Sequence, residues 1–214
     1  RDMFQEQAEA MERIRAENYR DSVTGLANRR YLDMQLKYLI NSEERFQMGA
    51  LILLEVKNLK AINDALGYVK TDALLLEMGN LIHEKCSRLP GVDHFAAHIA
   101  GADFAIVLPN ITENDVKDFI TQLMQSLPSL HDKGLVSDMD IAHAGVAFYR
   151  QQPFGDFLSE ADTALRAAQL KGANAWSINQ ESPATDVRSH TASEWAELLR
   201  RILHERKIVL FKQP

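Results

Sequence analysis

The sequence of 214 residues has little cysteine, no excess of positive charge and no long apolar run. Its single cysteine, Cys86, allows no disulfide within the chain, which is typical of proteins in reducing compartments. The formal net charge of -6 disfavours a nucleic-acid partner, because proteins that bind DNA or RNA usually present a basic face. No apolar run reaches the roughly 18 residues of a membrane span, so we expect no direct membrane contact here.

What the sequence does contain is the composition of a globular protein. It has 46% hydrophobic and 25% charged residues and is long enough to bury a core. The chain opens on Arg1 inside a helical pattern, without a methionine, and we expect it to be a piece of a longer protein. Five of its histidines show no metal-ligand spacing, so we expect surface or packing roles for them: His83, His94, His98, His131 and His143.

Helical and strand patterns alternate along the chain. Amphipathic periodicity predicts helices, and apolar runs predict strands, including one hairpin that turns at Gly101. Thr71 or Asp72 is expected to cap one helix and Thr112 another. The predicted helices cover residues 28–40, 71–85, 113–127 and 156–171, and the predicted strands cover 48–56, 96–108, 140–148 and 176–179. This order favours an α+β fold with a mixed or antiparallel sheet flanked by helices.

Residues 1–20 are charged, rich in helix formers and free of glycine and proline. Phe4, Met11 and Ile14 follow the alternating three-and-four spacing of a coiled-coil seam. We therefore interpret this stretch as a long signalling helix that forms a homodimer. The alternative is a solvated capping helix, since two heptads with a weak seam hold a dimer poorly by themselves.

Three ordered segments resemble motifs of the GGDEF family, the diguanylate cyclase domains. They are DSVTGLANRRYLD at 21–33, VKNLKAINDALGYVKTDALL at 56–75 and SEADTALRAAQLKGANAW at 159–176. The resemblance implies a GGDEF domain over residues 21–180 with the palm-like core of nucleotidyl cyclases, whose central sheet is mostly antiparallel.

The signature pentapeptide of the family departs from its pattern here. It reads Ala100, Gly101, Ala102, Asp103 and Phe104. The resemblance implies that one metal-binding acid ends the first core strand, at Glu55, and that the second would stand at Ala102, while Asp103 occupies the neighbouring position. The lysine and arginine that grip phosphate match Gln169 and Ala173. Mg²⁺ bound by paired carboxylates would activate the substrate, and only Glu55 remains of this pair. We therefore interpret the cyclase as silent and expect no metal site, with Glu55 as a lone remnant.

Base recognition is the part of the site that the sequence retains. Asn63 and Asp72 match the family's guanine contacts, although the simpler interpretation is that Asp72 caps a helix and Asn63 orders a turn, leaving the guanine site empty. The product-inhibition motif, an arginine followed three places later by aspartate, has no arginine in GVDH at 91–94.

The last part of the chain indicates a second module. Residues 181–192 are polar and read as a linker, and 193–214 resemble the opening of an EAL domain, with a helix followed by the strand KIVLFKQP. The whole arrangement resembles LapD-type receptors of the bacterial inner membrane. We therefore expect the cytoplasmic portion of such a protein, in which this domain relays the occupancy of an EAL-like domain that binds cyclic di-GMP outside this chain.

Two alternatives stay open from the sequence. The domain could be a GTP-responsive regulator, acting through Asn63 and Asp72, of an active EAL phosphodiesterase. It could also keep a residual cyclase activity, which Ala102 disfavours. In every case we expect no cofactor within this fragment.

Overall fold

A computed structural model of the chain describes residues 18–41, 48–89 and 93–179. Three predictions lie outside these residues: the dimer seam of Phe4, Met11 and Ile14, the linker at 181–192, and the EAL-like module at 193–214. In the described part, no helix is long and apolar enough to cross a membrane.

Six strands and six helices follow one another in the described residues. In chain order they are β1 Ala27–Asn28, α2 Arg29–Asn41, β2 Gly49–Val56, α3 Leu59–Leu66, α4 Tyr68–Cys86, β3 Phe95–Ala100, β4 Asp103–Pro109, α5 Glu113–Ser126, α6 Pro128–Asp132, β5 Ala142–Phe148, α7 Phe154–Gln169 and β6 Trp176–Ile178. The longer predicted helices and strands are confirmed to within a few residues at each end.

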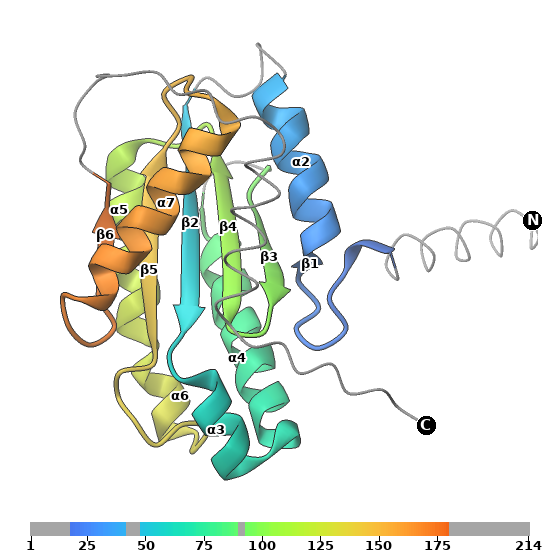
Figure 1. Cartoon of the computed structure of the whole chain (residues 1–214), viewed down its shortest axis with the longest axis vertical. Helices are drawn as coiled ribbons and strands as arrows, with labels where there is room; N and C mark the ends of the chain where they lie inside the picture. Colours follow the sequence, from blue (N-terminus) through green and yellow to red (C-terminus); the bar gives the residue numbers. More distant parts are fainter. Residues whose placement is uncertain (1–17, 42–47, 90–92, 180–214) are drawn as a thin grey trace, which may run out of the picture.

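The strands form one sheet in the order β1-β3-β4-β2-β5-β6. The pairs β3–β4, β4–β2 and β2–β5 are antiparallel, while β1 pairs with β3, and β5 with β6, in parallel. Strand β2 therefore lies in the middle of the sheet, between β4 and β5 (Figure 1). This arrangement confirms the α+β class with a mostly antiparallel sheet flanked by helices.

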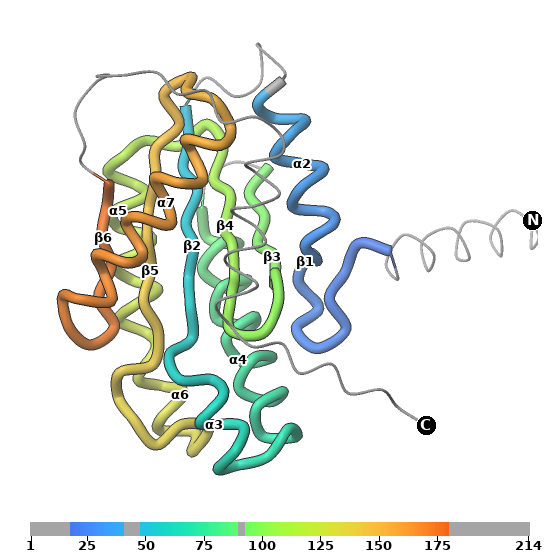
Figure 2. Tube along the Cα trace, viewed as in Figure 1, coloured from blue at the N-terminus to red at the C-terminus, as the bar shows by residue number. Residues whose placement is uncertain are grey.

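Helices cover both faces of the sheet (Figures 1 and 2). On one face, α2 and α7 bury Leu36 and Phe157 against the alternate residues of β2 and β4. On the other face, α4, α5 and α6 bury Met78, Ile120 and Leu130. Because both faces are covered, β2 and β4 are nearly continuous apolar runs rather than alternating ones.

Side-chain caps explain where two of the helices begin. The Asn28 carbonyl oxygen Oδ1 accepts a hydrogen bond from the Tyr31 amide at 3.1 Å and starts α2. The Thr112 hydroxyl accepts one from the Asp115 amide at 3.2 Å and starts α5, which confirms the predicted cap.

The predicted start of α4 is wrong. This helix begins at Tyr68 after Gly67, so Thr71 and Asp72 lie inside it and neither caps it. The Thr71 hydroxyl instead donates to the Gly67 carbonyl at 3.1 Å. Gly67 has a φ of 78°, a conformation that glycine adopts without strain, and this allows α3 and α4 to follow each other directly. Helix α3, which contains residues 60–64, was not among the predicted helices.

Candidate functional site

The signature pentapeptide forms the turn between β3 and β4. Gly101 has a φ of 54°, and the strand pairing shifts by a bulge between His98 and Ala100. The amide of Val56, at the end of β2, donates to the Ala102 carbonyl at 2.9 Å, so the turn is fixed against the end of the central strand. The Ala102 methyl is only 7% exposed and packs in the core beneath α4.

Glu55 and Asp103 lie directly opposite each other in the β2–β4 pair. Side chains alternate along a strand, so Asp103 is on the face of Glu55, whereas Ala102 is on the opposite face. This neighbour of Glu55 was not predicted, because the motif gives the order of the signature residues and not their register across the sheet.

Gln169 comes from the last turn of α7 and reaches the same place. Its amide nitrogen donates to Glu55 Oε2 at 3.0 Å. Lys171 lies beyond the end of α7, where its ammonium group donates to the Ser177 hydroxyl at 2.9 Å. At the position where the family resemblance implies a phosphate-binding lysine, the chain thus has the neutral amide of Gln169, and this amide is hydrogen-bonded to Glu55.

Beside this contact is an open pocket of about 310 Å³. Its lining includes Glu55, Lys57, Asp140, His143, Gln169 and Ala173. The structure therefore brings together Glu55, Gln169 and Ala173, three positions that the sequence assigned to one site. It adds Lys57, Asp140 and His143, which sequence reasoning did not select.

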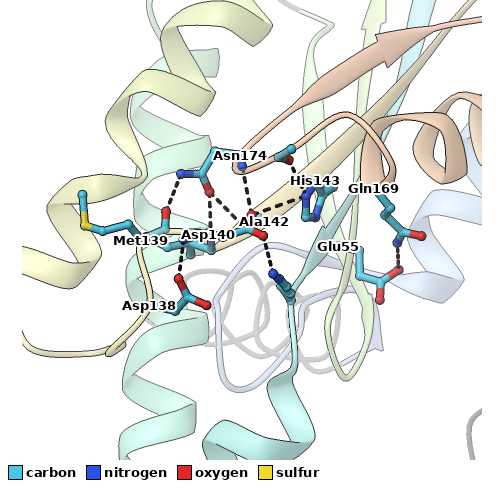
Figure 3. A network of polar contacts seen from close by, with 11 residues as sticks. Glu55, Asp138, Met139, Asp140, Ala142, His143, Gln169 and Asn174 are labelled. Atoms are coloured by element: carbon cyan, nitrogen blue, oxygen red, sulfur yellow. Dashed lines mark hydrogen bonds and ion pairs between the residues drawn. The ribbon is translucent and has the colours of Figure 1, made fainter.

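Asp140 is the centre of a polar network beside the pocket (Figure 3). It forms an ion pair with Lys57 and accepts from the Asn174 amide at 3.0 Å. Asn174 in turn accepts from the amides of Ile141 and Ala142, at 2.7 and 3.2 Å, and so fixes the start of β5 against the loop before β6. The His143 nitrogen Nε2 lies 2.9 Å from the Gly172 carbonyl oxygen and 3.4 Å from Asp140 Oδ1.

The pKa values of Asp140 and Lys57 in this network shift in opposite directions. Burial alone would raise the pKa of Asp140, but hydrogen bonds from Lys57 and from the Asn174 amide outweigh it and lower this pKa below its ordinary value. The hydrogen bond to Asp140 raises the pKa of Lys57. Lys57 is thus held against Asp140 as a charged pair, which leaves little net positive charge for an incoming phosphate.

Asn63 and Asp72, the predicted guanine contacts, lie on α3 and α4, on either side of the Gly67 turn. The Asn63 backbone carbonyl accepts from the Gly67 amide at 2.9 Å, so its main chain does order the turn. Its side-chain oxygen Oδ1 is buried without a hydrogen-bond partner, whereas Asp72 is exposed. Asp72 lies inside α4 and does not have its predicted role as a cap. The side-chain oxygen of Asn63 could accept a hydrogen bond that the fold does not supply.

The residues present do not fit a site for a pair of magnesium ions. In residues 18–41, 48–89 and 93–179, no three or more His, Cys, Asp or Glu side chains are grouped so that they could hold a metal ion. Glu55 and Asp103 supply two carboxylates, but one oxygen of Glu55 is bonded to Gln169 and Ala102 brings none. Paired carboxylates around each ion are what such phosphoryl chemistry requires.

Comparison with known proteins places this geometry in a family. Residues 18–175 match the family model described as diguanylate cyclase, GGDEF domain. The chain is 26% identical over 203 residues to the RNase E specificity factor CsrD of Escherichia coli, covering 94% of this chain and 31% of CsrD. It is 28% identical over 218 residues to the cyclic di-GMP phosphodiesterase PdeB of Shewanella oneidensis, covering 100% of this chain and 24% of PdeB.

A solved structure shows the same fold. The S helix, GGDEF and EAL portion of LapD from Vibrio cholerae, bound to c-di-GMP, superimposes with a TM-score of 0.69 at 22% identity, covering 94% of this chain and 46% of that one. The chain spans less than a third of the length of the two curated relatives. At this identity the structural likeness establishes the fold, and function has to be argued from the residues of the site.

Proposed function

The chain belongs to the GGDEF diguanylate cyclase family, and we propose that it is a regulatory member of this family without cyclase activity. The observation that carries the proposal is the hydrogen bond from the Gln169 amide to Glu55, at the end of β2. The signature turn beside it has Ala102 at the position that the family resemblance assigns to the second metal-binding acid. The neutral amide of Gln169 is hydrogen-bonded to the Glu55 carboxylate, and it stands where the family resemblance implies a phosphate-binding lysine.

The size of the defect follows from the electrostatics of phosphoryl transfer. Removal of one preorganised charged or hydrogen-bonding group at such a site costs about 10²-fold or more in rate. Here a metal-ligating acid at Ala102 and two phosphate-binding cations, at Gln169 and Ala173, are replaced together. The three losses act on the same developing charge, so we expect no measurable turnover.

We further propose that the domain is a relay. The N-terminal helix would form a homodimer through Phe4, Met11 and Ile14 and carry the signal to upstream domains at the cytoplasmic face of the inner membrane. An EAL-like domain beginning at 193–214 would bind cyclic di-GMP outside this chain. Support comes from the relatives: PdeB is a cyclic di-GMP phosphodiesterase, and the LapD structure contains an S helix, a GGDEF and an EAL portion.

One observation favours a second function, that of a GTP-responsive regulator of an active EAL phosphodiesterase. The buried oxygen Oδ1 of Asn63 has no hydrogen-bond partner, and such groups are costly unless a ligand or water satisfies them. With Asp72 exposed on the neighbouring helix, an amide and an acid are available for the polar edge of a guanine.

One experiment separates these functions. The 214-residue chain is incubated with GTP and Mg²⁺, the products are resolved by chromatography, and the same nucleotide is titrated by calorimetry. The relay predicts neither cyclic di-GMP nor binding heat. Micromolar GTP binding that Asn63→Ala abolishes and the exposed control Asn80→Ala retains would favour the regulator instead. Formation of cyclic di-GMP above the protein-free blank would overturn both proposals.

A further inference from the structure

His98 lies where the N-terminal turn, residues 21–26, meets the signature turn. Its side chain is 6% exposed on β3, and its ring lies 4.7 Å from the ring of Phe104. The ring nitrogen Nε2 is 2.9 Å from the carbonyl oxygen of Gly101. The other nitrogen, Nδ1, is 3.0 Å from Asp21 Oδ1, and the two groups form an ion pair when the imidazole is protonated.

Asp21 is held rigidly on its own side of this contact. Its oxygen Oδ1 accepts from the amides of Val23 and Thr24, at 3.2 and 2.8 Å, and from the Thr24 hydroxyl at 2.8 Å. Burial alone would raise the pKa of Asp21, but the Thr24 hydrogen bonds and His98 outweigh it and lower that pKa. Asp21 is therefore a carboxylate held in a fixed position at the first residue of the N-terminal turn.

The two partners of His98 determine the protonation state that fits this geometry. A neutral imidazole carries one N–H, so it can donate to one oxygen while the other nitrogen presents a lone pair. Both nitrogens of His98 face oxygens, and neither a carboxylate nor a carbonyl can donate a proton in return. Only the imidazolium, with both nitrogens protonated, is attracted to Asp21 and Gly101 at the same time.

Other charged groups belong to the elements around His98. Arg20, beside Asp21, donates to the Gly25 carbonyl at 2.7 Å. Asp103 on β4 shares the face of Glu55, whereas His98 shares the opposite face with Ala96. Strand β1 contributes only Ala27 and Asn28. On α4 the titratable groups include Asp72, Glu77, which pairs with Lys133, and His83.

We propose that His98 is a pH-dependent latch that joins the N-terminal turn to the signature turn. The imidazolium holds Asp21 and Gly101 together, and loss of one ring proton replaces an attraction by a lone pair facing an oxygen. The latch is closed while both ring nitrogens of His98 carry a proton and is weakened when one of them loses it, whereas the lowered pKa of Asp21 keeps its side chain a carboxylate. The consequence for signalling rests on the relay proposed above, because the latch lies between the N-terminal segment and the rest of the domain.

A double-mutant cycle on the 214-residue chain tests this latch. Asp21→Asn, His98→Gln and the double variant are unfolded with urea at pH 6 and at pH 8. We expect a coupling of about tenfold in the unfolding equilibrium constant at pH 6, and a coupling near one at pH 8. A coupling that is equal at the two pH values, or absent at both, would overturn the proposal.

A second measurement covers the case in which a variant does not fold. In the unsubstituted protein labelled with ¹⁵N, the two ring nitrogens of His98 report their protons directly. The latch requires both nitrogens to be protonated at pH 6 and one to lose its proton by pH 8. A ring that stays neutral at pH 6 would rule it out. Both measurements read protonation and stability only, so their outcome is independent of whether the chain turns over or binds GTP.

Discussion

At the residue scale, Asp140 decides how the pocket wall is held together. It connects Lys57 after β2, the start of β5 and the Asn174 loop before β6, three segments that come from distant parts of the sequence. Hydrogen bonds to an ionised acceptor are stronger than neutral ones, and the Asp140 side chain is only 17% exposed. The carboxylate therefore contributes to stability in its charged form.

We predict that Asp140→Asn lowers the free energy of unfolding at pH 7 by about 1–3 kcal/mol. The pKa of Asp140 is lowered in the folded state, so its contribution is present above the ordinary aspartate value near 4 and is lost as the pH falls through the lower, folded value. Urea unfolding between pH 7 and 3 should show a steeper acid loss for the parent than for the variant. Asp118→Asn, at an exposed position, is the control, and equal pH profiles for parent and Asp140→Asn would contradict the prediction.

Sequence reasoning at this scale succeeded where the signal was local. Thr112 was predicted as a cap because it stands three residues before an acid, Asp115, at the start of an amphipathic pattern. This spacing is a local signal for the start of a helix. Asp72 was misplaced as a cap because Gly67 starts the helix earlier through its backbone conformation. The Glu55–Asp103 pair and the Asp21–His98 contact depend on register between distant segments, which no local pattern contains.

At the element scale, α7 packs so closely on β5 that no Cβ atom fits between them at Gly145. Gly145 lies on β5 under this helix, and a Cβ atom there would lie 2.1 Å from the Leu165 amide nitrogen and 2.3 Å from the Ala161 carbonyl oxygen. Both atoms are helix backbone, which cannot yield as a flexible side chain can. The absence of a side chain at Gly145 therefore sets how closely α7, which carries Gln169, approaches the sheet.

We predict that Gly145→Ala destabilises the fold by at least about 3 kcal/mol, because the helix has to move away from the sheet as a unit. Urea unfolding measures this loss. The matched control is Gly79→Ala on α4, where the added Cβ would meet the Thr24 Cβ at 3.2 Å and the helix gains propensity, so a change within about 1 kcal/mol is expected. A loss within about 1 kcal/mol for Gly145→Ala as well would show that α7 can shift freely.

The elements themselves were predictable to different degrees. The long helices and β2, β4 and β5 have strong periodicity or apolar runs, which act over many residues and so survive tertiary packing. Helix α3 is only eight residues long and has no fully buried residue, and β1 is two residues long and exists through its pairing with β3. Both were missed for that reason.

At the scale of the whole molecule, the described residues contain two hydrophobic clusters, one on each face of the sheet. One hydrophobic cluster joins α4, α5 and α6 to the sheet, and the other joins α2 and α7 to its opposite face. Buried clusters on both faces of one sheet are the core of an ordinary single domain, so we expect residues 18–179 to fold by themselves.

We predict that a fragment of residues 18–179 folds and melts within about 4 °C of the 214-residue chain, which for a domain of this size corresponds to about 1 kcal/mol or less. A fragment of residues 27–179 is the matched control. It removes the N-terminal turn, with the buried Leu26 and the Asp21 partner of His98, and should melt clearly lower because it exposes apolar surface and leaves a buried imidazole without its carboxylate. Calorimetric melting of the three chains at pH 7 distinguishes the outcomes. If the 18–179 fragment melted as low as the 27–179 fragment, the flanking segments would be part of the folding unit, and the relay would have to act through the core rather than through the turn.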